Sequence, residues 1–152
     1  LSVSSAASDV YKRQEEKNLA KAFLQQTPWP FAANSPYFVK GSNFLKEKLG
    51  DGMHKGITAT ANGFYGPQGR SLRLGAKVPN LNEYLNRFEY KGNKITNFEM
   101  ETSALYGLCA LLGHEAGTVC AIIANRFSKS YSKDYKKTVD QLIELTLHRL
   151  TQ

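Results

Sequence analysis

Three short clusters of polar residues in this sequence carry side chains suited to binding a small polar molecule. Each cluster follows a predicted strand or lies at the start of a predicted helix. In open α/β sheets, ligands bind beyond the carboxyl ends of the strands. The clusters therefore occupy the positions where an α/β protein would hold its ligand. They are Gln68 with Arg70, Glu99 with Glu101, and Asn125 with Arg126.

The first cluster could recognise the edge of a planar ring. An amide side chain offers one acceptor and two donors, and a guanidinium offers a rigid fork of donors. Gln68 and Arg70 thus match a ring that bears carbonyl groups and an N–H, while Phe64 could stack on its face. The alternative is a Gly- and Pro-rich surface turn whose polar tips bind nothing.

The second cluster places two carboxylates around Met100. Glu101, near the expected start of a helix, could accept charge-assisted hydrogen bonds from vicinal hydroxyls, which suits a ribose. The alternative is that both carboxylates only stabilise the helix dipole and that the methionine is a core residue. In the third cluster, Arg126 ends an apolar run and would be a costly buried cation without a partner.

The elements that must position these clusters alternate between strands and helices, which predicts a layered α/β fold. Apolar periodicity and the Gly and Pro breaks predict their bounds. The run at residues 118–124 is apolar on both faces, as expected of a central parallel strand covered by helices. The expected strands cover residues 56–61 and 118–124, and the expected helices cover 15–24, 42–49, 81–88, from about 99–101 to 113, and 139–150.

The composition is that of an ordinary packed domain. The chain has 152 residues, 41% hydrophobic and 22% charged, which excludes collagen-like, coiled-coil and wholly disordered proteins. Its apolar runs are far shorter than the roughly 20 residues of a membrane helix, so no membrane partner is expected. Cys109 and Cys120 lack disulfide or metal-ligand spacing, and the three histidines form no metal pattern. We therefore expect a cytoplasmic protein without a metal.

An excess of basic residues leaves two classes of partner open. Twenty Lys and Arg against thirteen Asp and Glu give a net charge of +7, which suits a polyanion or an anionic small substrate. The basic residues are scattered apart from a patch at residues 129–137, and no nucleic-acid-binding motif accompanies them. This favours a solvated basic face and no nucleic-acid partner.

The first fourteen residues look foreign to the rest of the sequence. They begin without methionine and are too polar for a signal peptide, and residues 4–14 resemble the translation of a transposase sequencing adapter. We therefore expect native sequence to begin near Glu15 and an N-terminal portion of the protein to be missing. Residues 15–152 would then be the C-terminal portion of a single domain.

Three segments together resemble the nucleoside phosphorylase-I family. They are residues 58–70, with the pattern Phe-Tyr-x-x-Gln-x-Arg, residues 97–103 with Glu-Met-Glu, and residues 122–126. The resemblance implies a three-layer α/β/α sandwich with a mixed central sheet, assembled as dimers within a hexamer. It also implies a cytoplasmic pentosyltransferase that needs no cofactor. Members that act on uridine convert it, with inorganic phosphate as co-substrate, to uracil and ribose 1-phosphate.

The resemblance also implies roles for individual residues. The base would be held by Gln68 and Arg70, with Phe64 against the base or sugar, Arg126 beside Arg70, and Ile123 and Ala124 lining the pocket. The ribose would be held by Met100 and Glu101, with Glu99 supporting that site. Arg70, Gln68 and Glu101 would be the catalytic residues, and no residue would bind a metal.

One departure from the family favours a pyrimidine substrate, and another limits what the chain can do alone. Purine-specific members carry a Ser-Asp pair where Asn125-Arg126 stands here. The family's glycine-rich phosphate loop and its arginines have no counterpart in the chain. We therefore expect these 152 residues alone to be inactive and not to fold stably. The alternatives are a purine nucleoside phosphorylase, a nucleosidase of the same family, or a non-catalytic nucleotide- or nucleic-acid-binding module.

Overall fold

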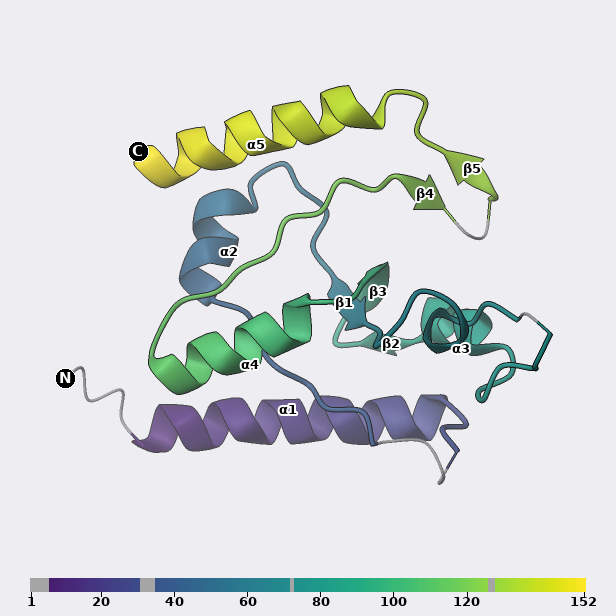
Figure 1. The fold of residues 1–152 in the computed structure, drawn as a ribbon. Coiled ribbons are helices and arrows are strands. Elements are labelled where there is room, and N and C mark those ends of the chain that lie inside the picture. Colours follow the sequence, from purple (N-terminus) through teal and green to yellow (C-terminus); the bar gives the residue numbers. More distant parts are fainter. Residues whose placement is uncertain (1–5, 31–34, 72, 126–127) are drawn as a thin grey trace. The chain divides into compact units, whose positions relative to one another are not determined.

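The computed structural model describes residues 6–30, 35–71, 73–125 and 128–152, with the backbone alone for residues 6–13. The chain divides into two compact units, whose helices and strands are labelled in Figure 1. The first comprises Leu1–Lys40 and Lys55–Leu108, and the second comprises Gly41–His54 and Cys109–Gln152.

The first unit contains a small sheet and three helices. Its helices are α1 (Ala6–Gln26), α3 (Leu81–Arg87) and α4 (Thr102–Leu112), whose last residues belong to the second unit. Its strands are β1 (Ile57–Thr60), β2 (Glu89–Tyr90) and β3 (Asn93–Glu99), and a short 3₁₀ helix, η1, covers Gly66–Gln68. The predictions of β1, α3 and α4 are confirmed.

Helix α1 is longer than predicted but ends where expected. It begins at Ala6, not near Glu15, because the preceding residues include alanine, lysine and arginine, which are good helix formers. At its end the Thr27 N–H still donates to the Phe23 carbonyl at 2.9 Å. Pro28 then has no N–H to continue the pattern, so the helix terminates at the predicted breaker.

The sheet has the strand order β1-β3-β2 and is mixed, as predicted. Strand β3 pairs parallel with β1 and antiparallel with β2. The hairpin turn between β2 and β3 consists of Lys91 and Gly92, both with positive φ (50° and 75°), which matches the right-handed twist of the strands. Strands β2 and β3 were not predicted, since lysine replaces the asparagine or aspartate that usually marks this turn.

A bulge in β3 decides which of its side chains reach the core. Ile57 pairs with Ile95, but the next residue, Thr58, pairs with Asn97, so β3 carries one extra residue. Ile95 and Phe98 would face opposite sides of a regular strand, yet both pack on the core. Because of this irregular spacing, the apolar residues of β3 do not alternate with period two, and the sequence pattern does not indicate a strand.

Gly56 permits this bulge. A Cβ atom at Gly56 would lie 2.3 Å from Thr96 Cγ2 and 2.9 Å from the Lys94 carbonyl oxygen. Only a residue without a Cβ atom allows the two chains to approach so closely.

Aromatic rings hold the core of the first unit together. Phe88, 1% exposed, lies at the end of α3. Its ring centroid is 5.3 Å from that of Phe23 of α1 in an edge-to-face arrangement, and Phe23 also contacts Trp29 and Phe38. The same core includes Val78, Leu81 and Leu85, with Ile57, Tyr90, Ile95 and Phe98 of the sheet packed against it. Helices α1 and α3 are thus fastened to the sheet through one cluster.

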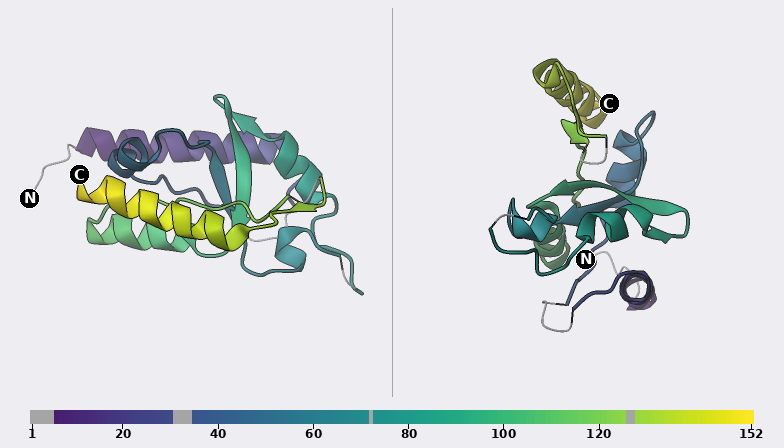
Figure 2. Two further views of the ribbon diagram at one scale, coloured as in Figure 1. Left: turned by 90° about the horizontal axis from the view of Figure 1, so that it is seen from above. Right: turned by 90° about the vertical axis from the view of Figure 1, so that its right-hand side faces the viewer.

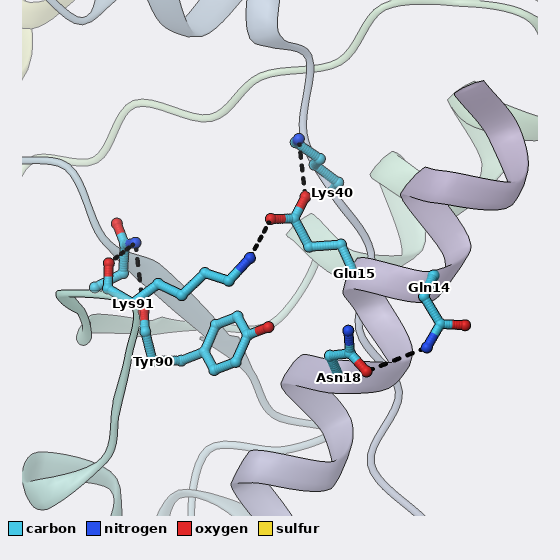
Figure 3. A network of polar contacts seen from close by, with 7 residues as sticks. Gln14, Glu15, Asn18, Lys40, Tyr90 and Lys91 are labelled. Atoms are coloured by element: carbon cyan, nitrogen blue, oxygen red, sulfur yellow. Dashed lines mark hydrogen bonds and ion pairs between the residues drawn. The ribbon is translucent and has the colours of Figure 1, made fainter. Parts of the chain in front are cut away.

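A polar contact ties the surface of α1 to the sheet. The Glu15 carboxylate lies between two ammonium groups, 3.4 Å from Lys40 Nζ and 3.3 Å from Lys91 Nζ (Figure 3). Hydrogen bonds from Lys91 and then Lys40 lower the pKa of Glu15. Because this network is exposed, it orients the groups more than it stabilises the fold.

The second unit is built on two helices and a short hairpin. Helix α2 (Asn43–Leu49) is capped by Ser42, whose Oγ accepts the Leu45 N–H at 3.0 Å, and it ends at Gly50, as predicted. Helix α5 (Tyr135–Thr151) closes the chain, as predicted. Its Arg149 donates to the carbonyls of Leu49, the last residue of α2, and of Asp51, two residues further on. The course of both helices can be followed in Figure 2.

The predicted central strand at residues 118–124 is wrong. Only Ala124–Asn125 forms a strand, β4, which pairs antiparallel with β5 (Ser130–Tyr131). A strand is held by hydrogen bonds to a neighbouring strand, and within the described residues no strand lies beside 118–123. Ile122 and Ile123 are 56% and 45% exposed, so these two side chains are not covered by helices as the prediction assumed.

No helix among the described residues has the length and apolarity required to span a membrane. Within the same residues, no group of three or more His, Cys, Asp or Glu side chains could hold a metal ion.

Removing the central ring should destabilise the protein strongly. We expect Phe88→Ala in the intact protein to lower the free energy of unfolding by about 3–5 kcal/mol, because it deletes buried ring contacts and leaves a cavity. Urea unfolding followed by circular dichroism measures this. Exposed Asn86 on the same helix is the matched control, and Asn86→Ala should change the value by about 0.5 kcal/mol or less. Equal losses in the two variants would contradict this account of the core.

Candidate functional site

The carboxyl ends of β1 and β3 lie side by side at one edge of the sheet. Thr60, the last residue of β1, is in register with Glu99, the last residue of β3. Just beyond, the Ala61 N–H donates to the Glu99 carbonyl at 2.9 Å. Glu99 ends β3, with Glu101 two residues beyond it, and the loop that carries Gln68 and Arg70 follows β1. The parallel pairing therefore makes both segments leave the sheet from the same edge.

The loop after β1 arranges Phe64, Gln68 and Arg70 as one cluster. The Arg70 guanidinium lies over the Phe64 ring, 3.7 Å from its centroid. Arg70 Nη1 donates to the Phe64 carbonyl and, at 3.1 Å, to Gln68 Oε1. Gln68 is 4% exposed, whereas Phe64 is 52% exposed. The cation thus joins a buried amide to a ring that remains open to solvent.

Local backbone geometry makes this cluster possible. The N–H groups of Gln68 and Arg70 both donate to the Tyr65 carbonyl, at 3.0 and 3.1 Å, which closes a tight turn around η1. Gly69 has φ +73°, and a Cβ there would meet the Asn82 amide at about 3 Å. The glycine therefore serves both the left-handed conformation and the close packing of the turn on α3.

Glu99 is held at the start of α4. Its Oε2 accepts the N–H groups of Glu101 at 2.7 Å and Thr102 at 2.5 Å, and its Oε1 accepts the Thr60 hydroxyl. Burial by itself raises the pKa of the Glu99 carboxyl, but these hydrogen bonds outweigh it and the pKa lies below its ordinary value. A carboxylate in this position caps the orphan N–H groups of the helix and complements its dipole.

Glu101 is placed quite differently. Its side chain is exposed, and its Oε2 accepts only a weak bond, at 3.2 Å, from the Met100 N–H among the bonds described for it. Met100 is 43% exposed, so it does not serve as a core residue here. The two carboxylates of the motif thus have separate positions: Glu99 points into the helix start, and Glu101 remains accessible to a ligand.

The other predicted site residues belong to the second unit or lie outside the described residues. Ile123 and Ala124 are exposed at the start of the β4–β5 hairpin. Asn125 Oδ1 accepts the Ser128 N–H at 3.1 Å within that hairpin. Arg126 lies outside the described residues. The structure arranges Phe64, Gln68 and Arg70 as one cluster and Glu99 and Glu101 as another, and the ligand-binding roles of both clusters, like those of Ile123, Ala124 and Arg126, stay predictions.

Sequence reasoning missed the residues that support Glu99. The Thr60 hydroxyl accepts the Ser103 N–H at 3.0 Å, and the Tyr37 hydroxyl lies 2.7 Å from Ser103 Oγ. In the sequence, Thr60 could be seen only as a hydroxyl residue at the end of a predicted strand, before the loop that carries Gln68 and Arg70. Its role could not be inferred, because the partner strand β3 was not predicted.

Comparison with known proteins identifies the family of this chain. A family model described as the phosphorylase superfamily matches residues 13–151. The chain is 39% identical over 97 residues to uridine phosphorylase of Thermococcus kodakarensis, an alignment that covers 60% of this chain and 32% of the relative. It is 27% identical over 121 residues to uridine phosphorylase of Haemophilus influenzae, covering 78% of this chain and 47% of the relative.

A solved structure shares the fold. The chain superimposes on a Trypanosoma brucei nucleoside phosphorylase, described as showing uridine phosphorylase activity, with a TM-score of 0.79 and 26% identity. The match covers 90% of this chain and 49% of that protein. The predicted fold class, that of the nucleoside phosphorylases, is confirmed. The chain spans about a third to a half of the length of the relatives it matches.

The Glu99 cap should make stability depend on pH in a defined direction. Because the folded-state pKa is lowered, the cap contributes fully above the unfolded pKa of about 4.3 and is lost as pH falls through the folded value. We expect Glu99→Gln in the intact protein to cost about 1 kcal/mol at pH 7. Urea unfolding at several pH values should show this difference shrinking below about pH 4.3. A pH-independent difference would contradict a role for the carboxylate charge.

Proposed function

The chain belongs to the phosphorylase superfamily, and on that premise we propose that the intact protein cleaves uridine with inorganic phosphate to give uracil and ribose 1-phosphate. The proposal rests on one observation. The loop after β1 carries an arginine that stacks on an exposed aromatic ring and holds a buried glutamine, and the end of β3, paired with the end of β1, leads to an exposed glutamate at a helix start. The relatives named above support the choice of uridine.

We further propose that residues 15–152 form the C-terminal portion of a nucleoside phosphorylase domain. The relatives are two to three times as long as the matched region, and the phosphate site would be supplied by the part of the protein that corresponds to the rest of their length. The intact enzyme would act as a dimer-based hexamer in the cytoplasm, with phosphate as co-substrate and without a cofactor.

The Phe64, Gln68 and Arg70 cluster would bind the base. Because Gln68 Oε1 already accepts from Arg70, the orientation of the Gln68 amide is set by the protein before a ligand arrives. As the glycosidic bond breaks, negative charge develops on the departing uracil. The Arg70 cation would stabilise that charge more strongly in the transition state than in the ground state, which is the condition for a faster reaction.

The Glu99–Glu101 cluster would bind the sugar. The accessible carboxylate of Glu101 would accept hydrogen bonds from the 2′- and 3′-hydroxyls of the ribose, with Met100 against the sugar. Positive charge develops on the ribose in the transition state, and phosphate attacks the face opposite the base. By fixing the sugar, Glu101 would align this attack, which is a positioning effect.

The third cluster would favour a pyrimidine. Asn125-Arg126 supplies no carboxylic acid that could protonate a purine ring nitrogen as it leaves. Arg126 would lie near the base beside Arg70, and Ile123 and Ala124 would line the base pocket. A purine nucleoside phosphorylase or a nucleosidase is the alternative within the family, and a panel of uridine and inosine, each with and without phosphate, separates them.

Loss of the arginine should reduce turnover. We expect Arg70→Ala in the intact protein to lower kcat for uridine about 10²- to 10³-fold, the usual effect of removing one group that stabilises developing charge. Phosphorolysis followed by the ultraviolet difference between uridine and uracil measures this. Exposed Arg73 in the same loop is the control, and Arg73→Ala should leave kcat within about twofold. An unchanged kcat in Arg70→Ala would remove Arg70 from the mechanism.

Loss of the accessible glutamate should weaken discrimination between sugars. Because a hydrogen bond to a charged group contributes about 1.5–3 kcal/mol, Glu101→Ala should lower kcat/KM for uridine about 10- to 100-fold. The value for 2′-deoxyuridine should fall less, since it lacks one of the two hydroxyls. Exposed Glu83 on α3 provides a charge-matched control. Parallel losses for both substrates would refute the assignment of Glu101 to the 2′-hydroxyl.

A further inference from the structure

The hydroxyl of Thr60 joins the end of β1 to the start of α4. It donates to Glu99 Oε1 and accepts the Ser103 N–H at 3.0 Å. One small side chain thus uses both its donor and an acceptor position on groups from two neighbouring elements. Ser103 is held in turn from another segment, because its Oγ lies 2.7 Å from the Tyr37 hydroxyl.

The Glu99 carboxylate connects Thr60 to the backbone of Glu101. Thr60 occupies one carboxylate oxygen, and the backbone N–H groups of Glu101 and Thr102 occupy the other. The peptide that carries Glu101 is therefore tied directly to a carboxylate that Thr60 orients. The side chain of Glu101 itself is exposed, so packing contributes little to its position, which must come from this backbone anchorage.

We propose that Thr60 is a positioning residue for Glu101, acting through the Glu99 cap. This inference rests on the proposed function, in which Glu101 binds the ribose hydroxyls. Thr60 does not touch the sugar in this arrangement. It determines where the accessible carboxylate stands, and a displacement of about 1 Å at such a group can cost up to about 100-fold in rate.

A merely structural role for Thr60 would produce a different result. Loss of a hydrogen bond that only stabilises the fold lowers stability without changing the preference between substrates. Misplacement of Glu101 instead affects uridine, which offers two hydroxyls, more than 2′-deoxyuridine, which offers one. The ratio of kcat/KM for these two substrates therefore separates positioning from stability.

The chain offers a closely matched control in Thr58, two residues earlier on the same strand. Its hydroxyl also donates across to β3, to Asn97 Oδ1 at 3.0 Å, but it makes no contact with Glu99 among the bonds described. Thr58→Val and Thr60→Val each remove a hydroxyl group that lies on β1 and donates to a side chain of β3. Only the second variant disconnects the cap of α4.

The experiment compares Thr60→Val, Thr60→Ser and Thr58→Val in the intact protein. We expect Thr60→Val to lower the uridine to 2′-deoxyuridine ratio of kcat/KM about 10-fold or more. Thr60→Ser keeps the hydroxyl and should restore the ratio to within about twofold, and Thr58→Val should leave it unchanged. In a Glu101→Ala background, Thr60→Val should lower the ratio no further, because the two residues act on one interaction.

The outcomes separate the inference from the function on which it rests. A wild-type protein that does not cleave uridine in the presence of phosphate overturns the proposed function and this inference with it. An active wild type whose ratio is unchanged in Thr60→Val overturns the inference alone. If Thr60→Val fails to fold, Glu99→Gln tests the same connection, and an unchanged ratio in that variant overturns the inference.

Discussion

The parallel pairing of β1 with β3 is the constraint on which the candidate site depends. It places Thr60 opposite Glu99 and so brings the ends of two strands, 39 residues apart in sequence, to one edge of the sheet. Every group of the proposed base and ribose sites in the first unit follows within ten residues of one of these ends. Because the strands are joined by hydrogen bonds on a rigid sheet, the loops begin from well-defined positions, which catalytic alignment requires.

The register of that pairing is set by packing as well as by hydrogen bonds. The bulge in β3 lets both Ile95 and Phe98 pack on the aromatic core around Phe88, and Gly56 leaves room for it. A shift of one residue would turn core side chains toward solvent, and it would also separate Thr60 from Glu99. The register of β1 with β3 that buries the core is therefore the same register that places Thr60 next to Glu99.

Glu99 and Glu101 carry identical side chains but lie in different environments. Glu99 accepts three hydrogen bonds and has a lowered pKa, so its carboxylate caps the start of α4. Glu101 is exposed, so its carboxylate is the one that a ligand could reach. In the loop after β1, contacts with Phe64 and Gln68 hold the Arg70 side chain in place. A side chain that is ordered before a ligand binds lowers the entropic cost of binding.

Local chemistry in the sequence determined much of this protein. Helix α2 begins at a serine cap and ends at a glycine, α1 ends before a proline, and α4 and α5 carry apolar stripes. These features depend on residues close together in the chain, so the sequence alone predicts them. The residues of the three polar clusters were also identified from the sequence. The sequence did not reveal β2 and β3, and it falsely suggested a strand at residues 118–124. Whether an extended segment becomes a strand is decided by a partner distant in sequence, and only the tertiary structure supplies or withholds that partner. For the same reason, the connection from Thr60 through Glu99 to Glu101 could not be read from the sequence, because it exists only once the two strands lie side by side.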